Sequence, residues 1–157
     1  MPVHPNRPRS RAAQAAATLM TCAGQSTQTY SSPLTLRTQM TEIDADVTYS
    51  SCVGGPVTAG TAAVASTAQA SCLLSGSSTV TQQTSWNSGA TSTTTGDTIA
   101  TRTLGQTIVV TRGTVTAGLF ADAQFTQTVI FVHPDPLACS TTGVGTVSGP
   151  LTITFTG

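Results

Sequence analysis

The sequence contains no lysine and few charged residues of any kind. Only 8% of its 157 residues are Asp, Glu, Lys or Arg, whereas about 25% is usual for a globular protein. From residue 12 onward, three arginines stand against six acidic residues, a formal charge of −3. Aromatic residues are also scarce, at 4%. With no basic patch for phosphates and few rings for base stacking, we expect no nucleic-acid partner.

The motifs of common catalytic sites are absent as well. The chain has no G-x-S-x-G elbow, P-loop or dinucleotide fingerprint. Its two histidines are His4, near the N-terminus, and His133, in an expected loop. Only Asp122 or Asp135 could orient His133 as a base, and a lone loop histidine is more often solvated than catalytic. We therefore predict that the protein is not an enzyme and needs no cofactor.

A metal site is also not expected. Glu42, Asp44 and Asp46 alternate along one segment, which places them about 7 Å apart on one face of a strand. Calcium needs six to eight oxygen ligands, more than this row supplies. We interpret the row as a solvated strand face that discourages edge-to-edge aggregation.

No run of the sequence approaches the roughly 20 apolar residues of a membrane-spanning helix. Residues 1–20 instead resemble a weak export signal: Arg7, Arg9 and Arg11 precede a short apolar stretch with small residues at 15–17. Two explanations stay open: a true signal lies upstream, or residues 1–20 are retained as a flexible or docking basic arm. We expect residues 21–157 to form a single exported domain.

Threonine and serine are abundant, with 33 and 16 residues. Threonine is β-branched, which favours strands, and its hydroxyl suits the wet face of a sheet. Polar and apolar residues alternate most clearly in 41–50, where Ile43, Ala45, Val47 and Tyr49 share one face. Turn signals recur every 8 to 15 residues, with no amphipathic helix between them. We predict an all-β, antiparallel, immunoglobulin-like β-sandwich of seven to nine strands, with a closed barrel as the alternative.

Further strands are expected between these turns. The continuous apolar run Val129–Val132 predicts a strand that is buried on both faces. The remaining strand regions are 57–70, 77–86, 90–103, 107–115 and 151–156.

The four cysteines predict two disulfides. Cys22, Cys52, Cys72 and Cys139 are separated by 29, 19 and 66 residues, unlike the close pairs of zinc sites or of a C-x-x-C redox motif. Four cysteines allow three pairings, and we favour Cys22–Cys52 with Cys72–Cys139. Each disulfide would stabilise a thin core by about 2–4 kcal/mol.

Two aromatic residues are candidate ligand contacts. Trp86, the only tryptophan, ends the expected strand 77–86, and either core packing or ligand stacking would suit its ring. Phe120 follows a Gly-containing turn. A concave apolar cleft beside Trp86 or Phe120 would favour a ligand-binding protein.

The chain resembles small secreted, disulfide-bonded β-sandwich proteins of Streptomyces and related actinobacteria. The resemblance spans residues 21–157 and rests on short segments in a common order: TCAG (21–24), YSSC (49–52), ASCL (70–73), WNSGATS (86–92), TRGTVTAGLF (111–120) and GPLTIT (149–154). It implies a non-enzymatic secreted protein. A similar protein is the adaptor between lectin and stalk in umbrella toxin particles, which implies an adaptor role here.

Two functions follow as expectations. The first is an exported protein-interaction or adaptor module, a subunit of a secreted or surface assembly whose partner the sequence does not identify. The second is a carrier of small molecules or carbohydrates, because the antitumour-antibiotic apoproteins of actinobacteria are similar in composition and also carry two disulfides.

Overall fold

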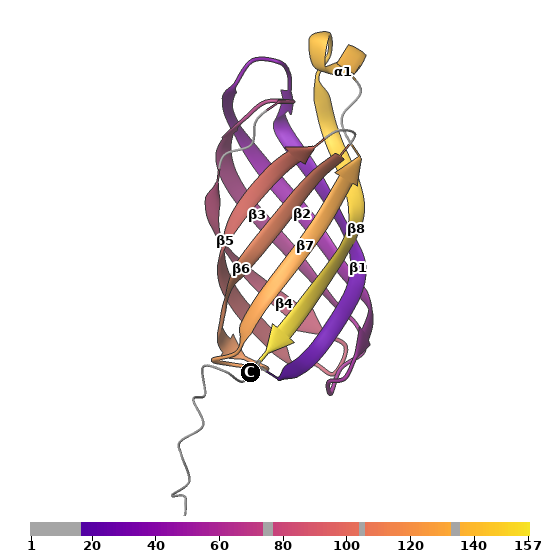
Figure 1. Cartoon of the computed structure of the whole chain (residues 1–157), viewed down its shortest axis with the longest axis vertical. Coiled ribbons are helices and arrows are strands. Elements are labelled where there is room, and N and C mark those ends of the chain that lie inside the picture. Colours follow the sequence, from indigo (N-terminus) through magenta and orange to yellow (C-terminus); the bar gives the residue numbers. More distant parts are fainter. Residues whose placement is uncertain (1–16, 74–76, 104–105, 133–135) are drawn as a thin grey trace, which may run out of the picture.

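The chain folds as a closed antiparallel barrel in which each strand pairs with the next and the last pairs with the first (Figure 1). The computed structural model describes residues 17–73, 77–103, 106–132 and 136–157. The elements are β1 (Thr18–Leu34), β2 (Gln39–Val53), β3 (Gly60–Ala70), β4 (Ser78–Trp86), β5 (Thr91–Thr103), β6 (Gln106–Gly118), β7 (Gln124–Val132), α1 (Pro136–Ser140) and β8 (Val144–Thr156).

The barrel corrects our expectation of an immunoglobulin-like sandwich, whereas the all-β class, the antiparallel pairing and the strand number are confirmed. Closure comes from β1, which pairs with β2 on one side and with β8 on the other. Alternation of polar and apolar residues is the same in a sandwich and a barrel, since both have one dry face. The two-residue alternation therefore predicts the strands, but it does not show that the first and last strands of the sheet pair with each other.

The N-terminal boundary of the barrel lies slightly before the one we expected. β1 begins at Thr18, and Met20 is fully buried in the core. Ala17 exchanges two main-chain hydrogen bonds with Gly157. The domain therefore includes residues that we assigned to the N-terminal segment, and residues 1–16 lie outside the described part of the chain.

The direction of the side chains in β2 confirms the alternation read from the sequence. Val47 and Tyr49 are buried, and Ile43 and Ala45 line the interior. The three acidic residues of this strand are exposed on the outer face.

The prediction for Val129–Val132 is wrong. Val129 and Phe131 are buried, but Ile130 is 39% exposed and Val132 is 78% exposed. The outer face of a barrel is in contact with solvent wherever no other element covers it, so even a continuously apolar strand has only one buried face here.

The two ends of the barrel differ. Figure 1 shows α1 at one end and the C-terminus at the other, and we call these the α1 end and the C-terminal end. Aromatic side chains fill the C-terminal end: the ring of Trp86 packs against Tyr49 at 5.6 Å and against Phe155 at 6.1 Å, and Phe120 lies 5.2 Å from Phe155. This end is therefore closed by a packed core.

The disulfides divide between the same two regions. The Cys22–Cys52 disulfide joins directly paired residues of β1 and β2 within the main core. The Cys72–Cys139 disulfide ties the segment after β3 to α1. These are the pairs that the sequence favours.

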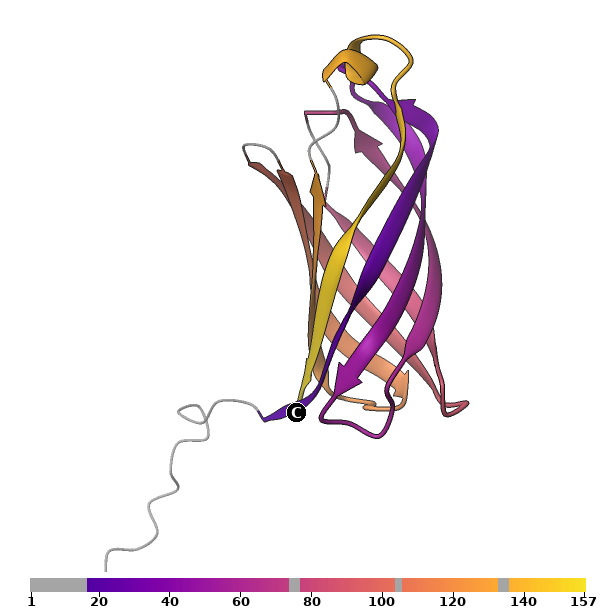
Figure 2. The same ribbon diagram turned by 90° about the vertical axis from the view of Figure 1, so that its right-hand side faces the viewer.

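A small second core forms around the Cys72–Cys139 disulfide at the α1 end. Leu34 and Ala70 are buried with the two cysteines, and Tyr30 packs against them. The main-chain N–H of Cys72 donates to the carbonyl of Thr35, at 2.8 Å. The connections that follow β1, β3 and β7 are thus held together over the β8–β1–β2–β3 side of the barrel, which Figure 2 shows from the side.

No helix in the described ranges is long and apolar enough to cross a membrane.

Two paired glycines let β5 and β6 approach closely. Gly96 lies opposite Gly113 in the register. A Cβ on Gly113 would lie 2.0 Å from the carbonyl oxygen of Thr95 and 2.5 Å from the Cα of Gly96, both main-chain atoms that cannot turn aside. Glycine at such points allows a strand to bend around the barrel.

We expect Gly113→Ala to lower the free energy of unfolding by about 2 kcal/mol or more, because the methyl group would push two strands apart. Gly145→Ala is the matched control, because a Cβ there meets no atom within 4 Å. Urea unfolding of the oxidised proteins measures both changes. Equal stability of the two variants would contradict the close approach of β5 and β6.

Candidate functional site

An internal cavity lies between the aromatic core and the α1 end, and all eight strands contribute to its wall. Its volume is about 120 Å³, so it can hold several waters or a small organic molecule. An eight-stranded barrel is of the width that holds one small ligand.

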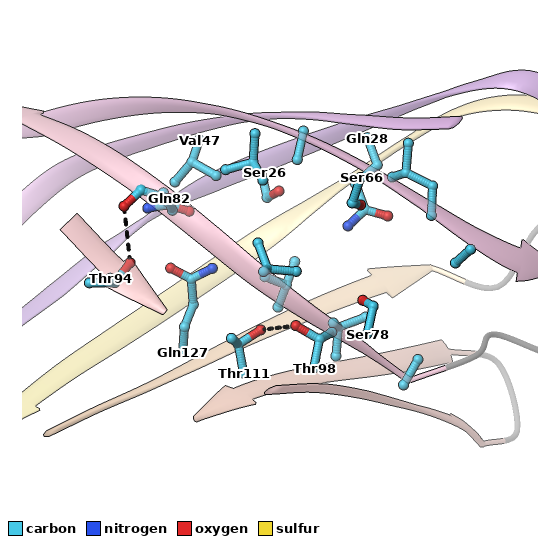
Figure 3. Close-up of a pocket in the computed structure, with 18 of the residues that line it drawn as sticks. Ser26, Gln28, Val47, Ser66, Ser78, Gln82, Thr94, Thr98, Thr111 and Gln127 are labelled. Carbon is cyan, nitrogen blue, oxygen red and sulfur yellow. Dashed lines mark hydrogen bonds between the residues drawn. The ribbon is translucent and has the colours of Figure 1, made fainter. Parts of the chain in front are cut away.

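The lining of the cavity is uncharged in the part of the chain that the structure describes. Small and branched apolar residues form much of the wall, among them Ala45, Val64, Ala68 and Val129. Hydroxyl and carboxamide groups are distributed between them, as Figure 3 shows: Ser26, Gln28, Ser66, Ser78, Gln82, Thr94, Thr98, Thr111 and Gln127. Burial of a charge without a partner is costly, so this lining suits an uncharged, partly polar molecule.

A hydrogen-bonded group separates the cavity from the aromatic core. The Tyr49 hydroxyl donates to Oε1 of Gln127 at 2.5 Å and accepts from Nε2 of Gln82 at 3.0 Å. The same Nε2 also donates to Oγ1 of Thr84 at 2.9 Å. The ring of Tyr49 belongs to the core, while both glutamines line the cavity. The tyrosine therefore fixes two of the polar groups that a ligand would meet.

Burial raises the pKa of Tyr49 to about 12, although the hydrogen bond from Gln82 partly opposes the shift. The charged phenolate is disfavoured away from water. The hydroxyl thus keeps its proton throughout the physiological range and remains a donor to Gln127.

A second polar pair lies closer to the α1 end. The hydroxyl of Tyr30 donates to Oε1 of Gln28 at 3.0 Å, and both residues line the cavity. Tyr30 also packs against the second core. The wall of the cavity is therefore connected to the disulfide-bonded end of the barrel.

The wall is incomplete between β3 and β4. These strands pair only over Gly60–Ala62 and Thr84–Trp86, although β3 pairs with β2 along its whole length and β4 with β5 from Ser78 onward. We call the remaining interval, residues 63–70 of β3 and 78–83 of β4, the β3–β4 seam. Several of its residues, including Val64, Ser66 and Val80, line the cavity. Several cavity-lining residues therefore lie where β3 and β4 are not paired with each other within the described part of the chain.

The aromatic residues that the sequence singled out lie elsewhere. Trp86 is buried, and its Nε1 donates to Oγ of Ser92 at 2.8 Å. Phe120 packs on Phe155 at the C-terminal end, in a turn where its φ is 64°. Neither residue lines the cavity. Their rings close the C-terminal end of the barrel and do not form a surface on which a ligand could stack.

The remaining candidate residues are not brought together. Glu42, Asp44 and Asp46 point outward, and no three His, Cys, Asp or Glu side chains among the described residues are placed to hold a metal ion. His4, His133 and Asp135 lie outside the described residues. Asp122 is exposed in the β6–β7 turn.

Sequence reasoning missed the three lining glutamines. Gln127 alternates with Phe125 and Val129 on a face of its strand that is otherwise apolar, and Gln82 shares a face with Val80 and Trp86. A large polar residue at an inward position of an alternating strand is a signal for an internal polar site. The candidates that the sequence singles out are instead histidines, acidic residues and aromatic rings.

Comparisons with known proteins identify no relative: no family model, no curated protein and no solved structure matches this chain.

Because the folded-state pKa of Tyr49 lies above the unfolded value of 10, its stabilising contribution is complete below pH 10 and is lost as the pH rises to about 12. The loss approaches roughly 3 kcal/mol over this range. We expect the free energy of unfolding to fall over this range in the wild type and less in Tyr49→Phe. Urea unfolding at pH 9 to 11.5 measures this, and parallel pH profiles for the two proteins would contradict it.

Proposed function

We propose that the protein is an exported, non-catalytic carrier of a small uncharged molecule, held inside the barrel. The observation that carries this proposal is the cavity between the aromatic core and the α1 end, with its hydroxyl, carboxamide and aliphatic lining. Concave, mostly preformed sites with a few placed polar groups are the usual form of small-molecule sites.

Two properties support binding without catalysis and outside the cell. The described lining residues include no His, Cys, Asp, Glu or Lys, the side chains that most often act as general acid or base near neutral pH. The two disulfides suit an oxidising compartment such as the cell exterior. Together they favour a secreted binding protein.

Filling the cavity should abolish binding. Ala45 lines the cavity, and Ala65 is exposed on the outer face of β3. We expect 2-naphthol, which is neutral at pH 7, to bind one to one, and Ala45→Phe to weaken this binding at least about tenfold. Ala65→Phe should leave it unchanged. Isothermal titration calorimetry measures both, and circular dichroism checks that each variant is folded.

Charge should oppose binding in the same experiment. We expect 2-naphthoate, of similar size but anionic, to bind at least about tenfold more weakly than 2-naphthol, because the described lining has no cation to pair with it. Equal affinity for the two probes would contradict the carrier proposal, and so would an affinity for 2-naphthol that is unchanged in Ala45→Phe.

We propose protein interaction as the second candidate function, and the β3–β4 seam is the observation that favours it. Within the described residues, the two facing strand edges lack partners for part of their main-chain groups. An extended peptide can add to such an edge through main-chain hydrogen bonds. This would suit the adaptor role in a secreted or surface assembly that the resemblance to secreted actinobacterial proteins implies.

Amide hydrogen exchange tests this second candidate. Successive residues of a paired strand direct their N–H groups to opposite sides. In the isolated protein, every second amide of 63–70 and of 78–83 should exchange fast, while its neighbours, which bond to β2 or β5, are protected. In the native assembly, a partner strand should slow the fast set. Uniform protection in the isolated chain would contradict an open seam.

A further inference from the structure

The Tyr49 hydroxyl imposes a fixed relation on the two carboxamides that it bonds. A phenolic hydroxyl carries one proton, so it can donate to only one of them and must accept from the other. It donates to Oε1 of Gln127 and accepts from Nε2 of Gln82. The carboxamide that accepts is left with its NH₂ group, and the one that donates is left with its oxygen. The two remaining groups are therefore one donor and one acceptor.

Both remaining groups face the cavity. Figure 3 shows the amide nitrogen of Gln127 and the amide oxygen of Gln82 on the same side, directed into the pocket. Since the two carboxamides share one hydroxyl oxygen, their bonded atoms are separated by no more than the length of two hydrogen bonds. Both hydrogens of the Gln82 amide are used, by Tyr49 and by Thr84. A ligand therefore meets a fixed oxygen beside a fixed NH₂ group.

The wall beside Gln127 is apolar along β7 and toward β8, whereas its partner in β6 is Thr111 and the partner of Gln82 in β5 is Thr94. Gln127 lies between Phe125 and Val129 along β7, and its partner in β8 is Ile153. All three neighbours line the cavity. A polar edge seated in such a wall gains from hydrogen bonds and is costly to leave unpaired. The ligand should thus combine one planar polar edge with an apolar body.

We propose that Gln82 and Gln127 form a recognition site for a ligand that carries an N–H and a C=O side by side on one edge, as in a lactam or a cyclic imide. The ligand N–H donates to Oε1 of Gln82, and the ligand carbonyl accepts from Nε2 of Gln127. Tyr49 is the positioning residue that holds both carboxamides. This inference rests on the proposed carrier function and names the class of its ligand.

Four uncharged probes of nearly equal size test the inference by calorimetric titration. 2-Quinolinone presents the lactam edge, coumarin has an oxygen in place of the N–H, 1-methyl-2-quinolinone has the N–H blocked, and naphthalene has no polar group. We expect the wild type to bind 2-quinolinone about tenfold or more tightly than coumarin, because coumarin leaves Oε1 of Gln82 without a donor. The N-methyl probe should bind more weakly still.

Variants assign the preference to its residues. In Gln82→Met and in Gln127→Leu, 2-quinolinone and coumarin should bind with equal affinity to within about threefold, while naphthalene binding is retained. Tyr49→Phe should reduce the preference without abolishing naphthalene binding. Gln28→Met is the matched control, since Gln28 lines the same cavity but bonds to Tyr30, and it should keep the full preference.

The outcomes separate this inference from the carrier proposal. Equal binding of lactam and lactone to the wild type would overturn the lactam site and leave the carrier function standing. A preference that survives both Gln82→Met and Gln127→Leu would also overturn it. Failure of all four probes, naphthalene included, to bind the wild type would overturn both proposals.

Discussion

The pairing of β1 with β8 is the contact on which the rest of the structure depends. It joins the two edges of the sheet and fixes the width of the interior. For a given width, the size of the inward-facing side chains determines which part of the interior is packed and which part contains a cavity. Near the C-terminal end, Trp86, Tyr49 and Phe155 fill the space. Toward the α1 end, alanine, serine and valine are too small to fill it, and a cavity results.

The scarcity of charge and the cavity are connected. The outer face of the barrel is kept wet mainly by threonine and serine, as in the cross-strand pairs Thr27–Ser148 and Thr81–Thr95. Inside, the same small uncharged residues leave space and supply hydroxyl groups without the cost of burying a charge. One composition therefore serves both faces, and glutamine provides the longer polar side chains of the interior.

Tyr49 links stability to the proposed function. Its ring packs on Trp86 in the core, and its hydroxyl holds Gln82 and Gln127 at the cavity. The packed core thus extends to the proposed site through Tyr49. Its hydroxyl limits the motion of the Gln82 and Gln127 side chains before any ligand binds. Preorganisation of this kind lowers the entropic cost of binding. At the other end, the Cys72–Cys139 disulfide ties the segment after β3 to α1.

The local features of the fold could be predicted from the sequence. Alternation gave the strands, and in β2 it also gave the face of each side chain, because a period of two is a property of the extended backbone alone. The spacing of the cysteines indicated two disulfides, because the chain lacks the closely spaced cysteine pairs that metal and redox sites need.

The closure of the barrel, the cavity and the polar groups that face it depend on the tertiary structure. Whether β1 pairs with β8 depends on the total curvature of the eight-stranded sheet, to which close approaches such as that of Gly96 and Gly113 contribute. No single segment of the sequence determines this total curvature. An aromatic ring suits both a packed core and a ligand-binding cavity. Only the fold shows that Trp86 and Phe120 belong to the aromatic core at the C-terminal end and not to the cavity lining. Gln82 and Gln127 are 45 positions apart in the sequence. They become one site because the barrel brings both to the single hydroxyl of Tyr49.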